Sequence, residues 1–245
     1  TTCGLTTVTL AGNTPAVPVW SSTWSVISGS GGSFSNQYSP TSTFTGIAGG
    51  TYTLRWTIYN DYCTTSYATS DDVVITFNRN VTTANAGADQ TGAATCGLTT
   101  VTLAANAPVV GTGNWSIVSG SGGLLGNSAS RTSSFTGAAG SAYTLRWTIS
   151  NSPCASSIDD VVIALNRSPT TANAGADQTG TSTCGLTSVV LASNAPSVGT
   201  GGWSIVSGIG GSFGNSASHT SSFTGTAGST YTLRWTISNS PCTSS

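Results

Sequence analysis

The chain has 245 residues, of which only 5% are charged, and its formal net charge is −1. This balance provides no basic patch, so nucleic acid and anionic membrane surfaces are excluded as electrostatic partners. No apolar stretch reaches the roughly 18 residues of a membrane-spanning helix, so we expect no membrane insertion in this segment.

One sequence pattern occurs three times along the chain. The motif Cys-Gly-Leu-Thr recurs about every 90 residues, and each occurrence is followed by the motif Tyr-Thr-Leu-Arg-Trp-Thr-Ile. The first motif begins at Cys3, Cys96 and Cys184, and the second begins at Tyr52, Tyr143 and Tyr231. We expect three domains, at residues 1–81, 82–169 and 170–245.

Short strands are predicted in chain order within each copy. In the middle copy apolar and polar residues alternate over 100–105, 115–117 and 143–150, a last strand is expected at Val161, Ile163 and Leu165, and shorter strand candidates surround 124–125 and 134–136. A period of two marks a strand with one buried face. The chain contains no Lys, Glu or Met, which favour helices. Glycine-rich turns separate the strands, and the whole pattern predicts an all-β, immunoglobulin-like sandwich in each copy.

The copies at the two ends are shorter than the middle copy. The first lacks a counterpart of Ala-Gly-Ala-Asp-Gln at 86–90, and the third stops before a counterpart of Asp-Asp-Val-Val-Ile at 159–163. A sandwich without an edge strand leaves main-chain groups unpaired. We therefore expect the first copy to lack its first strand and the third its last. We also expect the native chain to extend beyond both ends, with a strand-swapped filament as the alternative.

Each copy contains two cysteines, about 60 residues apart. One precedes the second strand and the other follows the sixth, positions that we place at the same end of a Greek-key sandwich. This predicts one disulfide in each copy, with free buried thiols as the alternative. The expected pairs are Cys3–Cys63, Cys96–Cys154 and Cys184–Cys242. Such bonds place the chain in an oxidising compartment, the cell exterior or the periplasm.

A family resemblance rests on motifs that recur through the copies. They are Ala-Asn-Ala-Gly-Ala-Asp-Gln, Cys-Gly-Leu-Thr-Thr-Val-Thr-Leu, Gly-Asn-Trp-Ser-Ile-Val-Ser-Gly, Tyr-Thr-Leu-Arg-Trp-Thr-Ile and Asp-Asp-Val-Val-Ile. The chain resembles the PKD-like repeats of very large secreted surface proteins of Bacteroidota, including gliding-motility-associated and adhesin-like proteins exported by the type IX secretion system. The resemblance implies tandem β-sandwiches that act as stalks or spacers at the cell surface.

Few side chains are suited to catalysis. His219 is the only histidine, and its counterparts in the other copies are Arg131 and Pro40, so we expect a surface-loop residue there. With every cysteine paired, no thiolate remains as a nucleophile. We therefore predict no catalytic residues and no enzymatic activity.

Three other groups of residues are binding candidates. Oxygen ligands for calcium are available from Asp89, Asp159, Asp160 and Asp177, although the same residues suit turn caps and strand edges. Calcium is the only cofactor that these side chains suggest. The recurring Arg55, Arg146 and Arg234 suit either a ligand or, preferably, a cross-strand bond to Asp. Trp20 belongs to the first copy alone and is a candidate exposed contact residue.

Three functions follow from these observations. The leading hypothesis is a non-catalytic, extracellular repeat array that forms the stalk or filament of a bacterial cell-surface adhesin, with neighbouring repeats or subunits as its partners. The second is a carbohydrate-binding or targeting module of a secreted enzyme. The third is a self-assembling filament built from the repeats themselves. Surface glycans and other cells are further candidate partners.

Overall fold

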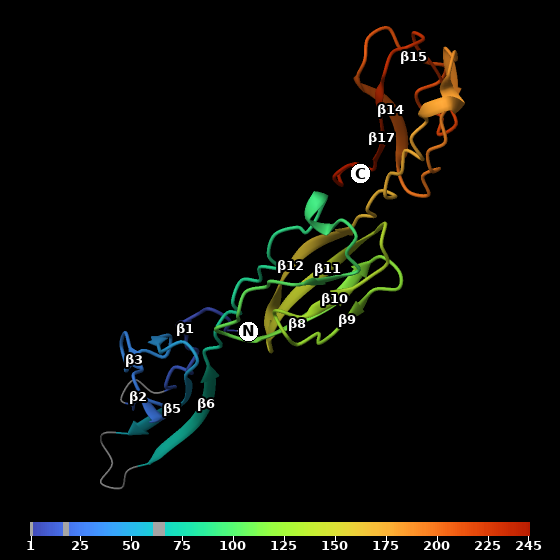
Figure 1. Cartoon of the computed structure of the whole chain (residues 1–245). Helices are drawn as coiled ribbons and strands as arrows, with labels where there is room; N and C mark the ends of the chain where they lie inside the picture. The colour runs from blue at the N-terminus through green and yellow to red at the C-terminus, as the bar shows by residue number, and fades with distance from the viewer. Residues whose placement is uncertain (1, 17–19, 61–66) are drawn as a thin grey trace. The chain divides into compact units, whose positions relative to one another are not determined.

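The computed structural model describes residues 2–16, 20–60 and 67–245, and it consists of short strands joined by turns (Figure 1). The described part contains no α-helix; its helical turns are the 3₁₀ segments η1 (Gly92–Thr95) and η2 (Gly180–Thr183). The prediction of an all-β chain is confirmed. Its physical basis is the shortage of helix formers together with the alternation of apolar and polar residues.

The first sequence copy forms two small antiparallel sheets. One has the order β1-β4-β3 and the other the order β2-β5-β6. The strands are β1 (Thr7–Thr9), β2 (Trp20–Ser28), β3 (Ser33–Phe34), β4 (Thr43–Thr45), β5 (Thr51–Asn60) and β6 (Ala68–Thr76). Both sheets contribute to one buried cluster that includes Phe44, Trp24 and Trp56, so they pack face to face as a sandwich.

The same pairing recurs along the second and third copies. The second has the orders β7-β10-β9 and β12-β11-β8, and the third has β13-β16-β15 but only β14-β17 in its other sheet. The second-copy strands are β7 (Thr100–Thr102), β8 (Thr112–Ser119), β9 (Leu124–Leu125), β10 (Ser134–Thr136), β11 (Ser141–Asn151) and β12 (Cys154–Leu165). The third-copy strands are β13 (Ser188–Val190), β14 (Thr200–Ser207), β15 (Ser212–Phe213), β16 (Ser222–Thr224) and β17 (Thr232–Ser238).

A pair of tryptophans stands at the centre of each core. The ring centroids are 4.9 Å apart for Trp24 and Trp56, 5.1 Å for Trp115 and Trp147, and 5.2 Å for Trp203 and Trp235. On β11 the alternate residues Tyr143, Leu145, Trp147 and Ile149 are all at most 1% exposed. Burial of such side chains stabilises each sandwich by about 1.5–3 kcal/mol per residue. All six of these tryptophans are buried core residues.

A tyrosine hydroxyl bridges the turn before each central strand. The Tyr143 hydroxyl accepts the Ala138 N–H at 2.8 Å and donates to the Ser121 carbonyl at 3.3 Å. Tyr52 and Tyr231 make the same two kinds of bond in the other copies. Gly120 packs on this ring with φ of +95°, and an added Cβ would lie 2.3 Å from the Tyr143 ring, so only glycine fits there.

By contacts, the chain divides into two compact units. One contains Thr1–Asn85, Asn106–Asn114 and Thr148–Asp159; the other contains Ala86–Ala105, Trp115–Trp147 and Asp160–Ser245. Each unit therefore combines an outer copy with one part of the middle copy. The boundaries expected after residues 81 and 169 follow the sequence repeats and remain a prediction.

Candidate functional site: disulfides between sequence copies

The cysteines of one copy bond to cysteines of the next copy. Cys3 is bonded to Cys154, and Cys96 is bonded to Cys242, with sequence separations of 151 and 146 residues. The expected pairs Cys3–Cys63, Cys96–Cys154 and Cys184–Cys242 are therefore wrong, and Cys184 is an exposed free thiol. Cys63 lies outside the described residues.

The course of β12 explains why Cys96 does not pair with Cys154. Cys154 is the first residue of this 12-residue strand, whereas Cys96 lies beside its far end, where the Gly97 N–H donates to the Asn166 carbonyl at 2.8 Å. At about 3.3 Å per residue, the two ends of the strand are roughly 40 Å apart. A disulfide requires Cα atoms within about 7 Å of each other. The two cysteines of one copy thus lie at opposite ends of the sandwich, not at the same end.

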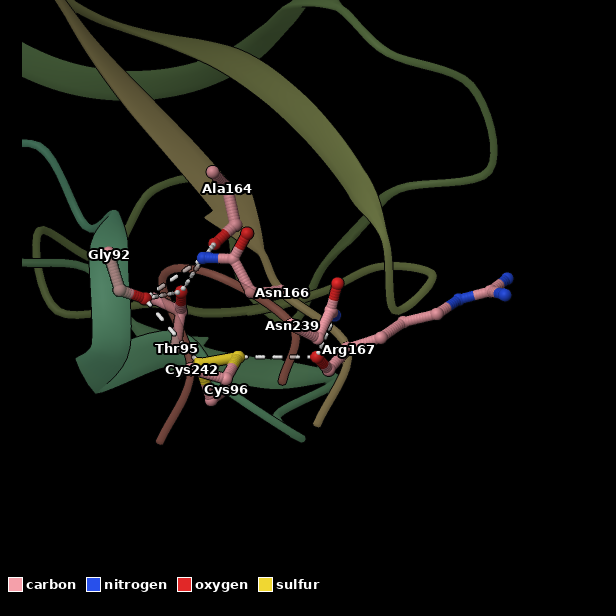
Figure 2. Close-up of a disulfide and its surroundings, with 8 residues drawn as sticks. All are labelled: Gly92, Thr95, Cys96, Ala164, Asn166, Arg167, Asn239 and Cys242. Atoms are coloured by element: carbon pink, nitrogen blue, oxygen red, sulfur yellow. Dashed lines mark hydrogen bonds between the residues drawn. A yellow bond between two sulfur atoms is a disulfide. The ribbon is translucent and has the colours of Figure 1, made fainter. Parts of the chain in front are cut away.

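The linker between copies is held at the Cys96–Cys242 bond by side-chain amides (Figure 2). The Asn239 amide donates to the Arg167 carbonyl at 2.7 Å. The amide of Asn166 donates to the Gly92 carbonyl and to the Thr95 hydroxyl, both at 2.9 Å. Arg167 O also lies 3.2 Å from Cys242 Sγ, a packing contact because a disulfide sulfur carries no proton. These bonds fix the chain as it leaves the strand.

The Cys3–Cys154 bond has the same surroundings. The Asn151 amide donates to the Arg79 carbonyl at 3.0 Å, as Asn239 does to Arg167. Further along, the Ala84 N–H donates to Ser157 Oγ at 2.9 Å, and the Val110 N–H donates to Thr82 Oγ1 at 2.8 Å. The linker is therefore an ordered, hydrogen-bonded segment. Sequence reasoning missed the two asparagines, although each recurs three residues before the second cysteine of its copy.

Two of the three recurring arginines, Arg55 and Arg146, pair across strands, as expected in preference to ligand binding, whereas Arg234 is exposed and has no ion pair among the described residues. Arg55 donates to both carboxylate oxygens of Asp72, at 2.7 and 2.9 Å, and Arg146 does the same with Asp160, at 2.7 and 2.8 Å. These hydrogen bonds lower the pKa of both aspartates below the ordinary value. Both pairs are partly exposed, so solvent screens them.

The calcium candidates are not gathered around a common centre. Asp160 is paired with Arg146, and Asp89 Oδ1 accepts the Val162 N–H at 2.9 Å. Asp159 is half-buried and Asp177 is exposed. Throughout residues 2–16, 20–60 and 67–245, no group of three or more His, Cys, Asp or Glu side chains is placed to hold a metal ion. The geometry thus favours the alternative of strand-edge and turn contacts.

Trp20 and His219, the two remaining candidates from the sequence, both contact nearby residues of the fold. Trp20 begins β2 and is half-buried against the core of the first sandwich, so it is less exposed than expected. Its role as a contact residue stays a prediction. His219 lies in a turn, where its carbonyl accepts the Ser193 N–H at 3.0 Å. Among the residues described, no helix is long and apolar enough to cross a membrane.

Comparisons with known proteins give no family assignment. No family model matches the chain, and no curated protein matches it. Among solved structures, a protocadherin gammaB7 EC3-6 cis-dimer has 12% identity over 92% of this chain and 64% of its own, with a TM-score of 0.37. Immunoglobulin domains 1–4 of Sidekick-1 have 11% identity over 98% of this chain and 69% of their own, with a TM-score of 0.38. SGBP-B of the Bacteroides ovatus mixed-linkage glucan utilization locus, in complex with a mixed-linkage heptasaccharide, has 13% identity over 97% of this chain and 59% of its own, with a TM-score of 0.24.

Proposed function

We propose that the chain is a non-catalytic, extracellular array of three immunoglobulin-like, PKD-like β-sandwich repeats, at 1–81, 82–169 and 170–245. The array serves as the stalk or filament of a bacterial cell-surface adhesin. The observation that carries the proposal is the pairing of Cys3 with Cys154 and of Cys96 with Cys242. Bonds that join successive copies strengthen the array along its length, whereas a bond within each copy would strengthen only that copy.

The two disulfides determine which part of the chain bears a tensile load. Tension applied at Cys3 and Cys242 passes through the first disulfide, along the chain from Cys154 to Cys96, and through the second disulfide. That path contains roughly 60 residues and extends to about 200 Å at most. Without disulfides, roughly 240 residues extend, to about 800 Å. The outer copies are therefore protected from unfolding under load, which suits a long surface protein.

Composition supports an exposed, weakly interacting surface. Disulfides persist in oxidising compartments, which favours a secreted protein. A charge content of 5% limits indiscriminate electrostatic binding. The central tryptophans are buried in the cores, so they offer no aromatic row to a sugar, and the stalk is favoured over a carbohydrate-binding module.

Single-molecule stretching between handles at the two ends tests the load path. The oxidised chain should reach a contour length about fourfold shorter than the reduced chain. Cys154→Ser leaves the Cys96–Cys242 bond, so the path lengthens to roughly 90 residues, about 320 Å. Cys184→Ser is the matched control and should leave the length unchanged. Equal contour lengths before and after reduction would contradict the proposal.

The biological setting requires a separate test. An antibody raised against one repeat should place immunogold along thin fibres on intact source cells. Antigen found only in the medium would instead support the alternative function, a carbohydrate-binding or targeting module of a secreted enzyme.

A further inference from the structure

Three side chains lie in a row at one end of the sheet β2-β5-β6 in the first sandwich. Trp20 of β2 is directly opposite Asn60 of β5. The Asn60 N–H donates to the Tyr67 carbonyl at 3.3 Å, and this bond continues the register of β5 with β6 by one residue on each strand. Residues that are opposite one another in neighbouring strands place their side chains on the same face of the sheet. Trp20, Asn60 and Tyr67 therefore form a row across three strands, here called the aromatic row.

Both rings of the aromatic row are accessible to a ligand. Tyr67 is 70% exposed, and Trp20 is half-buried against the core of the sandwich. The other six tryptophans of the chain are at most 6% exposed. Because Trp20 and Tyr67 are separated by two strand spacings, their Cα atoms are about 10 Å apart. Two large rings that stay accessible side by side are typical of a contact surface, not of a core.

The aromatic row is a feature of the first sandwich alone. Four residues before the first central tryptophan of each copy, Trp20 corresponds to Gly111 and Gly199. These glycines have φ of +99° and +96°, and a Cβ added to either would lie 2.6 Å or less from a main-chain oxygen. Beside Gly111 the Thr82 N–H of the linker donates to the Val110 carbonyl at 3.0 Å. The first sandwich thus has a tryptophan in a regular strand where the second has the glycine turn that holds its linker.

The surroundings of the aromatic row are polar but carry little charge. The next row on the same face consists of Ser22, Ile58 and Thr69, so two hydroxyls lie beside the rings. In the described part of these strands, the nearest charged residue on this face is Asp71, two rows along. The C–H face of a sugar ring packs on an aromatic ring, and its hydroxyls bond to amides and hydroxyls. These groups suit a neutral sugar, whereas an anionic glycan would find no counter-charge.

We infer that the aromatic row binds an extended, neutral glucan chain. Trp20 and Tyr67 each stack on the C–H face of one glucose ring, and Asn60 lies between them with both donor and acceptor groups. The separation of about 10 Å is close to the length of one disaccharide unit in an extended β-1,4-linked chain. All ring hydroxyls of such a chain are equatorial, so both faces of every ring carry C–H groups. The inference concerns the first sandwich and holds whether or not the array is a stalk.

Iodide quenching of tryptophan fluorescence, with cellohexaose as the ligand, tests the site on the full chain. Because the other six tryptophans are buried, iodide mainly quenches Trp20. Cellohexaose should protect Trp20 from iodide in a saturable way. An oligomer of six galacturonic acid residues, which carries a carboxylate on every ring, should give no protection at the same concentration.

Variants at Tyr67 show whether the sugar occupies the aromatic row. Tyr67→Ala should weaken cellohexaose binding about tenfold, because one stacking ring is lost. Tyr67→Phe should retain binding, since the ring remains. Tyr38→Ala is the matched control, because Tyr38 is 62% exposed in the same sandwich but lies in the turn between β3 and β4. Hydrogen exchange of the β5 amides verifies that each variant is folded.

Three outcomes would overturn the inference. The first is the absence of any protection of Trp20 up to millimolar cellohexaose. The second is binding that Tyr67→Ala leaves unchanged, which would place the sugar elsewhere on the chain. The third is a dimer in sedimentation experiments that Tyr67→Ala dissociates, which would identify a second copy of the chain as the occupant. None of these results alters the contour lengths expected from the disulfides, so the two proposals fail separately.

Discussion

Cys96 is bonded to Cys242, a residue of the following sequence copy and 146 positions away. This pairing predicts a specific peptide map. Digestion of the alkylated, unreduced protein should release peptides joining Cys3 to Cys154 and Cys96 to Cys242, detectable by mass spectrometry. Peptides joining Cys96 to Cys154 would contradict the structure. In the loop-closure model each bond stabilises the fold by about 5 kcal/mol, so reduction should markedly lower the unfolding temperature.

The free thiol of Cys184 should react selectively. It is exposed, whereas its counterparts Cys3 and Cys96 are in disulfides. Iodoacetamide added to the native, unreduced chain should label Cys184 and leave Cys3, Cys96, Cys154 and Cys242 unlabelled, as measured by peptide mapping. Labelling of Cys96 without denaturant would show that the bond to Cys242 is absent.

Trp147 should be essential to the second sandwich. It is 1% exposed and packs at a tilt against Trp115, with ring centroids 5.1 Å apart, so Trp147→Ala leaves a cavity and should destabilise the fold by about 3–5 kcal/mol. Unfolding by denaturant, monitored by hydrogen exchange of the β11 amides, measures this loss of stability. Trp20→Ala is the control, because Trp20 is half-buried, and its effect should be smaller and confined to the first sandwich. Equal losses would show that the burial pattern is wrong.

Tyr143 should stabilise through its hydroxyl as well as its ring. Tyr143→Phe keeps the packing but leaves the Ala138 N–H and the Ser121 carbonyl without their bonds. Each lost hydrogen bond costs about 0.5–1.5 kcal/mol. The same substitution at exposed Tyr38, which is 62% exposed, should have little effect on the unfolding midpoint. An unchanged unfolding midpoint for Tyr143→Phe would show that the hydroxyl does not stabilise the turn.

The Arg–Asp pairs predict a dependence of stability on pH. Arg146 lowers the pKa of Asp160, mainly through their hydrogen bonds. A carboxyl group with a lowered pKa in the folded state stabilises the protein above its ordinary pKa, and this contribution is lost as the pH falls through the lowered value. Between pH 5 and pH 2, Asp160→Asn should therefore show a shallower loss of stability than the unsubstituted chain.

Asp177→Asn is the matched control for this titration. Asp177 is exposed and has no ion pair within the described part of the chain, so its variant should lose less stability at pH 7 than Asp160→Asn. A shallower curve for Asp177→Asn than for Asp160→Asn would show that the ion pair is not the source of the pH dependence.

The strands were predictable because their signal is local. Alternation over 143–150 predicted the strand that the structure places at Ser141–Asn151, and the repeated Arg predicted the partner on the next strand. Side-chain direction in a strand depends only on residue parity, which a sequence displays directly.

The disulfide partners were not predictable from the same signal. Two cysteines per copy fit a bond within a copy and a bond between copies equally well, since either repeats with the same period. The deciding fact is that Cys96 lies beside the end of β12 and Cys154 begins that strand.

The two disulfide-closed loops overlap, since Cys96 lies inside the first and Cys154 inside the second. A protease that cuts one peptide bond anywhere between Cys3 and Cys242 therefore produces two fragments that remain attached. A cut before Cys96 leaves the Cys3–Cys154 bond across the gap, a cut after Cys154 leaves Cys96–Cys242, and a cut between them leaves both. A single nick between Cys3 and Cys242 therefore leaves these two cysteines covalently connected.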